Sequence, residues 1–175
     1  MRTVTSPDAP IRLFVMDVDG TLTDGTITYA ADGVELKSFH ARDGAGIKLL
    51  AEAGVTPAIV TGRTSHAVAH RAGELGIQTV VQGVGDKLAV VNEIRLEAEL
   101  PWSAVAFMGD DLTDIPPMRH AGFSAAPSDA APEVQRIASH VCSVRGGRGA
   151  VREAIETLLR QQGAWEAILS RLGAL

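Results

Sequence analysis

Short apolar runs alternate along the chain with segments in which apolar residues recur every three or four positions. The apolar runs cover residues 11–16, 55–60, 78–81, 104–108, 122–126 and 140–144. Their near-continuous hydrophobicity is typical of strands that are buried on both faces. Two stripes between and after them, 68–75 and 151–159, have helical spacing. This alternation predicts an α/β fold with a doubly wound, Rossmann-like parallel sheet.

The segment 25–39 interrupts this alternation directly after the first predicted strand. It has the pattern of two short strands around Asp32-Gly33, a dipeptide typical of hairpin turns. A lone hairpin is marginally stable in water and its edges favour pairing, so it packs either on its own domain or against other copies of the chain. Because the hairpin stands outside the regular alternation, we favour pairing between copies.

The chain has 175 residues, enough for one domain with a substantial core and too few for two ordinary ones. We expect a single domain over 1–175, with a hairpin flap at 25–39 and loose ends at 1–10 and 161–175. The net charge of −5 and the low aromatic content argue against a nucleic-acid partner. The start lacks the apolar core of a signal peptide and no run is long enough to span a membrane, so we expect a cytoplasmic protein without a membrane partner.

Cysteine and histidine residues give no strong signal of a reactive thiol or a metal site. Cys142 is the only cysteine and lies in a strand-like run, so we interpret it as a small buried hydrophobe. His66 and His70 have a spacing that can bind zinc on one helix face. No glutamate lies between them in the HAVAH segment and no third ligand is near, so we interpret them as part of a solvated face.

Two carboxylates, Asp17 and Asp19, directly follow the first apolar run, while Thr61 and Asp110 follow two others. Ligands of parallel α/β sheets bind at the carboxyl ends of the strands, so these residues are expected to converge. Clustered carboxylates repel one another, and Mg²⁺ with a phosphate would offset that repulsion. Lys87 lies in the first turn of a predicted helix, where the dipole disfavours a cation, so it is expected to face an anion. Taken alone, Thr61 would be an ordinary strand residue.

Several of the acidic residues also have structural alternatives. Asp17 and Asp19 could be turn formers. Asp111 could cap a helix, with Asp114 three residues on, as a capping-box-like pair. Asp43 could be a plain N-cap or a part of the site.

The ordered set of motifs resembles that of a known superfamily. DVDGT at 17–21, Thr61, Lys87 and GDDLTD at 109–114 are similar to the four motifs of the haloacid-dehalogenase superfamily, in order. From about residue 12 to 160 the chain more specifically resembles the 3-deoxy-D-manno-octulosonate 8-phosphate phosphatases, through the patterns TDGxIxY, GxExKxF, xRDGxGI, VTGR, QGVxDKL, GDDLxD and GGRGAVRE. Thr21 departs from this branch, which often has valine there, but fits the wider superfamily. Only a hairpin follows the first motif, so no large cap domain is expected.

The resemblance implies a role for each motif residue in a Mg²⁺-dependent phosphatase. Asp17 would attack phosphorus and form an aspartyl-phosphate, while Asp19 would protonate the leaving oxygen and then activate water. Asp17, Asp110 and the backbone carbonyl of Asp19 would hold Mg²⁺. Thr61 and Lys87 would bind the phosphoryl oxygens.

The resemblance also implies supporting and substrate-binding residues. Asp111 and Asp114 would support the metal ligands from behind. Arg63 would bind the α-keto carboxylate of the sugar, with an ordinary surface arginine as the alternative. Arg148, in a glycine-rich and anion-friendly loop, would contact the substrate of a neighbouring subunit, with a plain loop ahead of a helix as the alternative.

The leading function is therefore hydrolysis of a deoxy-octulosonate 8-phosphate, a small sugar phosphate, which would place the chain in lipopolysaccharide biosynthesis. One alternative is hydrolysis of a nonulosonate 9-phosphate or another small sugar phosphate, and another is a weakly active tetramerisation module of the same fold. A phosphomutase is disfavoured because no cap is available to hold an intermediate. Since an open site admits water and selects substrates poorly, we expect hairpin 25–39 of a neighbour to cover it in a homotetramer.

Overall fold

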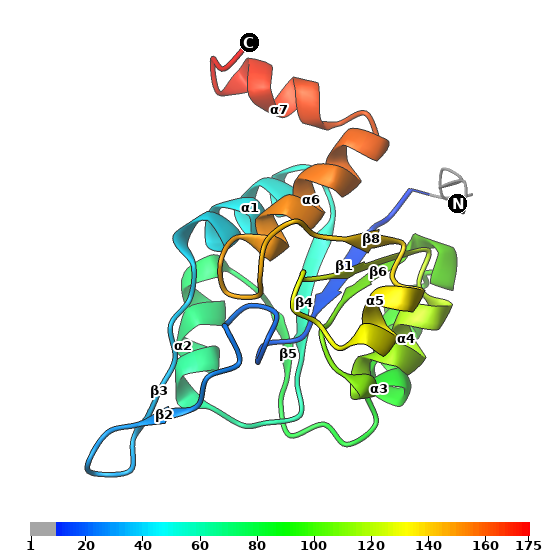
Figure 1. The fold of residues 1–175 in the computed structure, drawn as a ribbon. Helices are drawn as coiled ribbons and strands as arrows, with labels where there is room; N and C mark the ends of the chain where they lie inside the picture. The colour runs from blue at the N-terminus through cyan, green and yellow to red at the C-terminus, as the bar shows by residue number, and fades with distance from the viewer. Residues whose placement is uncertain (1–9) are drawn as a thin grey trace.

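The structure, a computed structural model, describes residues 10–175 (Figure 1). Its main sheet has six parallel strands in the order β5-β4-β1-β6-β7-β8. These strands are β1 (Leu13–Met16), β4 (Thr56–Val60), β5 (Thr79–Val81), β6 (Val105–Met108), β7 (Phe123–Ala126) and β8 (His140–Val141). The predicted doubly wound parallel sheet is confirmed. Of the expected loose segment 1–10, residues 1–9 lie outside the described part of the chain.

Helices cover both faces of this sheet. They are α1 (Ala41–Glu52), α2 (His66–Leu75), α3 (Lys87–Glu97), α4 (Ile115–His120), α5 (Pro132–Ile137), α6 (Ala150–Gln161) and α7 (Trp165–Arg171), with short 3-10 helices at Trp102–Ala104 and Leu112–Asp114. α1, α2 and α6 lie on one side of the sheet, and α3, α4 and α5 lie on the other (Figure 1). Within residues 10–175, no helix has the length and apolar character needed to cross a membrane.

The strands form because their residues can be buried on both faces at once. In β1, Phe14 and Met16 join the core under α1, α2 and α6, while Leu13 and Val15 join the core under α3, α4 and α5. All four side chains are buried, and full burial of such a side chain stabilises the fold by about 1.5–3 kcal/mol. The helical stripe expected over 151–159 is also buried, through Val151, Ile155, Leu158 and Leu159 on α6.

The direction in which the chain winds reverses at β1, which fixes the position of the site. From β1 the chain passes to β4 and β5 on one side, and it later returns to β6 on the other side of β1. In open α/β sheets, ligands bind beyond the carboxyl ends of the strands at such a reversal. Asp17, the first residue after β1, stands at this point.

The insertion 25–39 is a hairpin, as predicted. β2 (Thr28–Tyr29) and β3 (Glu35–Leu36) pair antiparallel, and Gly33 adopts a φ of +85° in the turn. The hairpin extends away from the main sheet, at the opposite end of the molecule from α7 (Figure 1). Its large apolar side chains, between 45% and 60% exposed, are Ile27, Tyr29, Val34 and Leu36.

Two expectations about the C-terminal part are wrong. The last strand ends at Val141 rather than at 144, because the backbone N–H of Ser143 binds the Glu153 carboxylate on α6 instead of a strand. Residues 161–175 are not loose throughout, because α7 buries Trp165 and Ile168. The indole of Trp165 also contacts two guanidinium groups from α6, which favours its position through cation–π attraction.

Candidate active site

The carboxyl ends of three neighbouring strands bring the predicted acidic residues and Thr61 to one edge of the sheet. Asp17 follows β1, Thr61 follows β4, and Asp110 lies two residues beyond β6. The strands end level with one another, since Met16 pairs with both Ile59 and Met108. The first turn after β1 is tied to β6 as well, because the Asp17 N–H donates to the Met108 carbonyl over 3.0 Å. Both Asp17 and Thr61 are buried.

Lys87 begins α3 and reaches into this group of carboxylates. Its Nζ lies 2.8 Å from Asp17 Oδ2 and 2.6 Å from Asp114 Oδ1, and its side chain is only 4% exposed. Burial alone would lower the pKa of Lys87, but the charges of Asp17 and Asp114 raise that pKa above its usual value. The lysine therefore stays charged and faces anionic groups, as its position at the start of a helix predicted.

Asp110 stands opposite Asp17 in a crowded and partly buried place. Its burial and the charge of Asp17 raise the pKa of Asp110 to about 7, although a hydrogen bond from the Thr21 hydroxyl over 3.0 Å opposes this shift. Gly20 leaves room for the carboxylate, since a Cβ there would lie 2.0 Å from Asp110 Oδ2. The glycine of the DVDGT motif is thus required by close packing as well as by its φ of +89°.

Asp114 is fully buried and organises the loop that follows β6. Its Oδ2 accepts hydrogen bonds from the backbone N–H groups of Asp110 and Asp111 over 3.0 and 3.1 Å, while its Oδ1 binds Lys87. Asp111 is exposed and caps the short helix Leu112–Asp114, and with Asp114 it forms a capping box. The structure thus contains the capping-box alternative, and Asp114 in addition fixes the position of Lys87.

The donor set at this edge fits a hard divalent cation. Oxygen atoms of Asp17, Asp110 and Asp114 lie within 4.8 Å of one another. Both oxygens of Asp114 are engaged in hydrogen bonds, but Asp17 Oδ1 is buried without a hydrogen-bond partner among residues 10–175. A buried carboxylate oxygen without a partner is unfavourable, and a cation with oxygen ligands would satisfy it.

Asp19 lies on the more open side of the site and is held by two basic side chains. Lys37, the first residue after β3, forms an ion pair with Asp19 Oδ1, and Arg63 Nε lies 3.6 Å from Asp19 Oδ2. The Lys37 side chain is almost fully buried. Sequence reasoning assigned no function to Lys37, although this lysine is part of the GxExKxF pattern that carries the family resemblance.

Arg63 joins the site to the hairpin. Its Nη2 donates to Glu35 Oε1 over 2.7 Å and to the Tyr29 hydroxyl over 3.3 Å. The Arg63 side chain is 43% exposed and lies beside Asp19. Arg63 is therefore near the site, but its contacts are with hairpin side chains. Glu35 and Tyr29 are further neighbours of the site that sequence reasoning missed.

Arg148 lies at the outer border of the same region. The glycine loop before α6 packs tightly on the DVDGT segment, since a Cβ on Gly146 would lie 1.8 Å from the Gly20 carbonyl oxygen. The Gly147 N–H also donates to the Thr21 carbonyl over 3.0 Å. Arg148 itself is 67% exposed, with Nη2 3.4 Å from Asp24 Oδ2.

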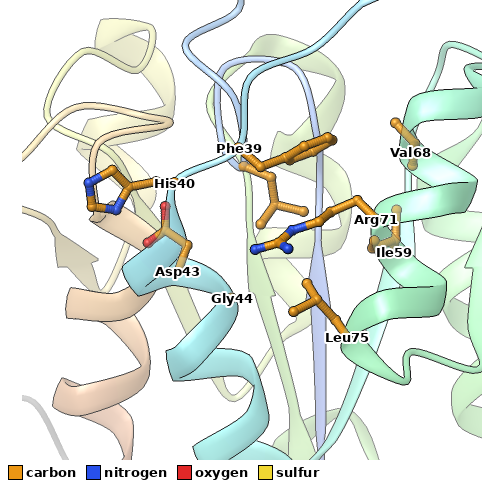
Figure 2. A pocket seen from close by; sticks show the side chains of 9 residues that line it. Phe39, His40, Asp43, Gly44, Ile59, Val68, Arg71 and Leu75 are labelled. Atoms are coloured by element: carbon orange, nitrogen blue, oxygen red, sulfur yellow. The ribbon is translucent and has the colours of Figure 1, made fainter.

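Asp43 lies outside the carboxylate group. The N-cap alternative is wrong, because α1 begins at Ala41 and has His40 as its N-cap. Asp43 Oδ1 instead accepts the backbone N–H of Arg152 over 2.8 Å and so links α1 to the start of α6, while burial raises its pKa. Its neighbours line a mainly apolar pocket between α1 and α2, into which Arg71 and Leu75 point (Figure 2).

The comparisons with known proteins agree with this geometry. A scan against models of protein families found no match. Over 158 residues the chain is 42% identical to the 3-deoxy-D-manno-octulosonate 8-phosphate phosphatase KdsC of Yersinia pestis. The aligned region covers 90% of this chain and 84% of that protein.

Two solved structures are similar over almost the whole chain. One is the 3-deoxy-D-manno-octulosonate 8-phosphate phosphatase of Moraxella catarrhalis in complex with magnesium, phosphate and KDO, with a TM-score of 0.90, 38% identity and 93% of each chain covered. The other is the cobalt-bound deoxy-D-mannose-octulosonate 8-phosphate phosphatase of Haemophilus influenzae, with a TM-score of 0.85 and 38% identity, covering 90% of this chain and 92% of that one.

Proposed function

Because the chain belongs to the 3-deoxy-D-manno-octulosonate 8-phosphate phosphatase family of the haloacid-dehalogenase superfamily, and is a phosphatase, we propose that it hydrolyses 3-deoxy-D-manno-octulosonate 8-phosphate. The observation that carries this proposal is the group of buried Asp17 and Lys87 with partly buried Asp110 at the carboxyl ends of β1 and β6. A cytoplasmic location and a place in lipopolysaccharide biosynthesis remain predictions from the sequence.

Asp17, Asp110 and the backbone carbonyl of Asp19 would hold Mg²⁺. The partnerless Oδ1 of Asp17 and the crowding of Asp110 against it support this choice. Asp114 is left out because its Oδ2 accepts hydrogen bonds from two backbone N–H groups and so uses both lone pairs, while its Oδ1 binds the ammonium of Lys87, which would repel a metal ion at that oxygen. When bound, Mg²⁺ neutralises charge on the transferring phosphoryl group. The similar protein of Moraxella catarrhalis was solved with magnesium and phosphate.

The residues of the chain would carry the reaction in two displacements. An Asp17 oxygen attacks phosphorus as the bond from phosphorus to the sugar oxygen breaks, and Asp19 gives that oxygen a proton. Asp19 then takes a proton from water, whose oxygen attacks the phosphorus and releases phosphate and free Asp17. Lys87 holds Asp17 in position and, with Thr61, binds phosphoryl oxygens. Lys37 and Arg63 keep the Asp19 carboxylate in place between these steps.

Substrate recognition would use the arginines at the border of the site. Arg63 is beside Asp19 and half exposed, and its planar guanidinium matches the α-keto carboxylate of the sugar in a bidentate contact. The Glu35 carboxylate accepts from only one nitrogen of the Arg63 guanidinium, so other N–H donors of Arg63 remain for a ligand. Arg148 lies farther out and would reach the substrate of a neighbouring subunit.

A substrate panel tests this function. With Mg²⁺ we expect kcat/KM for the octulosonate 8-phosphate to exceed that for a nonulosonate 9-phosphate and for p-nitrophenyl phosphate, and we expect EDTA to abolish all three activities. Arg63→Met should raise KM for the keto-acid substrate about 10-fold, since a charged hydrogen bond is lost, and should leave KM for p-nitrophenyl phosphate, which has no carboxylate, unchanged. Any fall in kcat should be shared by both substrates, because Asp19 loses one of its two basic neighbours. Preference for the 9-phosphate would favour the alternative phosphatase, and no turnover with Mg²⁺ would favour the tetramerisation module.

We also propose that hairpins of neighbouring copies pair in a homotetramer and cover one another's sites. The hairpin exposes four large apolar side chains, two on its short strands and two directly before them, and such a surface favours association. Residues 10–175 form no large cap over the site, and each hairpin is linked to it through Arg63 and Lys37. A neighbouring hairpin would thus exclude water from the Asp19 side of the site.

Light scattering at micromolar protein concentration should give the mass of a tetramer. We expect the double variant Val34→Lys/Leu36→Lys to be a monomer, because two charges would have to be buried in the interface. Leu96→Lys on α3 is the matched control, since Leu96 is 57% exposed and Leu36 is 53% exposed. A monomeric wild type, or a tetramer that persists in the double variant, would exclude hairpin-mediated assembly.

The affinity for Mg²⁺ should depend on pH through Asp110. Its pKa is raised to about 7, so in the metal-free protein the carboxyl is protonated below that pH and competes with the cation. The apparent affinity should fall by up to about tenfold per pH unit below pH 7 and level off above it. Calorimetric titration of Mg²⁺ between pH 6 and 8 measures this dependence. Thr21→Val removes a hydrogen bond that lowers the pKa and should move the midpoint upward, whereas an affinity constant over this range would contradict the assignment.

A further inference from the structure

Three side chains that commonly bind transition metals meet away from the carboxylate site, between the end of the sheet and α6. His140 and Cys142 are two residues apart at the β8 strand, so they project to the same face. Glu153 lies in the first turn of α6. A ring nitrogen of His140, the Cys142 sulfur and a Glu153 oxygen all lie within 4.8 Å of one another. Thiolate, imidazole and carboxylate form a donor set that suits zinc.

The cluster is closed on the cysteine side and open on the other. Cys142 is 3% exposed, while the side chains of His140 and Glu153 are 24% and 27% exposed. His140 Nε2 lies 3.6 Å from Glu153 Oε1. Ligand atoms around tetrahedral zinc are about 3.5 Å apart, so a small movement of these side chains would complete the geometry. Solvent can supply the fourth ligand from the open side.

We propose that His140, Cys142 and Glu153 bind Zn²⁺ at a second metal site, separate from the carboxylate group at the ends of β1 and β6. On binding, the Cys142 thiol releases its proton to solvent and the sulfur bonds to zinc, with no change in oxidation state. The charges of the thiolate and the Glu153 carboxylate balance the dication.

The Glu153 contacts are compatible with a bound ion, while the hydrogen bond that the Cys142 thiol donates to the Ala150 carbonyl over 3.3 Å would be lost when the thiol releases its proton. The Glu153 oxygens accept hydrogen bonds from the Ser143 N–H over 2.8 Å and the Ser143 hydroxyl over 2.7 Å. Each carboxylate oxygen keeps a further lone pair, and such hydrogen bonds orient a ligating carboxylate. Burial and the charges of Glu153 and Asp43 raise the pKa of Cys142 to about 12, so the free thiol stays protonated. A thiol that coordinates a metal ion is deprotonated outright.

The ion would connect the two ends of the loop 143–149. This loop packs on the DVDGT segment, where the Gly147 N–H binds the Thr21 carbonyl. Zinc would therefore stabilise the loop that carries Arg148. At about 100 times its dissociation constant, Zn²⁺ should raise the Tm of the protein by about 5 °C or more.

Cobalt serves as the spectroscopic probe, in the full chain with saturating Mg²⁺. Because Cys142 is the only cysteine, a near-ultraviolet thiolate-to-cobalt charge-transfer band would report this site alone. Co²⁺ at the carboxylate group has oxygen ligands and gives no such band. We expect the band in the wild type and in Asp17→Asn, its loss in Cys142→Ser, and its bleaching by one equivalent of Zn²⁺.

Variants of the other two ligands keep the proposal testable if Cys142→Ser fails to fold. His140→Gln and Glu153→Gln each remove one proposed ligand. Loss of a group that only supports a ligand weakens metal binding about 10–100-fold, so each variant should weaken Co²⁺ binding by at least that factor. His70→Gln, on the exposed face of α2, is the matched control and should bind like the wild type. A wild type without the band, or a band of unchanged affinity in both ligand variants, would overturn the proposal.

Discussion

Asp17→Asn should reduce the phosphatase activity by at least about 10⁴-fold while the protein remains folded. The substitution replaces a nucleophilic carboxylate oxygen with an amide of nearly the same shape, so the packing of this 6% exposed residue is kept. An asparagine carbonyl can still accept a hydrogen bond from Lys87, which lies 2.8 Å from Asp17 Oδ2. The loss should therefore fall on kcat and not on stability, which a thermal unfolding curve beside the kinetics would establish.

The covalent step can be observed directly. In a rapid acid quench with ³²P-labelled substrate, the wild type should retain label on the protein as an acyl phosphate that hydroxylamine removes. Asp17→Asn should retain none. Asp32→Asn makes the same chemical change in the exposed hairpin turn, where asparagine can accept the same hydrogen bond from Val34, and should match the wild type. Label on the Asp17→Asn protein, or activity within tenfold of wild type, would mean that another group attacks phosphorus.

The convergence of Asp17, Thr61 and Asp110 could be predicted from the sequence because it follows from strand order and strand direction alone. Asp17 and Thr61 come directly after an apolar run and Asp110 comes one residue later, and parallel strands end at the same edge of the sheet. Lys87 could be predicted for a similar reason, since a lysine at a helix start is unfavourable without an anion nearby. All of these inferences use local patterns and one general property of α/β sheets.

The contacts of Lys37 and Glu35 could not be predicted in this way. A hairpin has its own two-residue period, which fixes its register but not the direction in which it leaves the domain. Whether Lys37 reaches Asp19 depends on that direction. The same limit applies to His140, Cys142 and Glu153, which are joined by a loop and a helix start and so form no linear motif. The position of α7 depends on contacts of Trp165 with side chains on α6, which the pattern of apolar residues does not encode.

Lys87→Met should destabilise the protein in EDTA by about 3–5 kcal/mol, the usual effect of removing one partner from a buried ion pair. Lys87 is the buried cation that contacts both Asp17 and Asp114, and Asp110 adds a third carboxylate to the same group. Without the lysine, these carboxylates repel one another or must take up protons, as the raised pKa of Asp110 already indicates. Activity should fall at least about 10²-fold, because a cation beside the phosphoryl group is lost as well.

Magnesium distinguishes this electrostatic explanation from a packing defect. A divalent cation that binds only the folded state stabilises that state. Removing Lys87 makes the carboxylate group more negative. Mg²⁺ should therefore raise the free energy of unfolding of Lys87→Met by more than it raises that of the wild type. Urea unfolding in EDTA and in Mg²⁺ measures the difference, and Lys48→Met, which removes an exposed lysine from α1, is the control. Lys87→Met could instead lose the same free energy of unfolding, relative to wild type, in EDTA and in Mg²⁺. The lysine and the metal would then not balance the same charges. The assignment of Mg²⁺ to the carboxyl ends of β1 and β6 would be wrong.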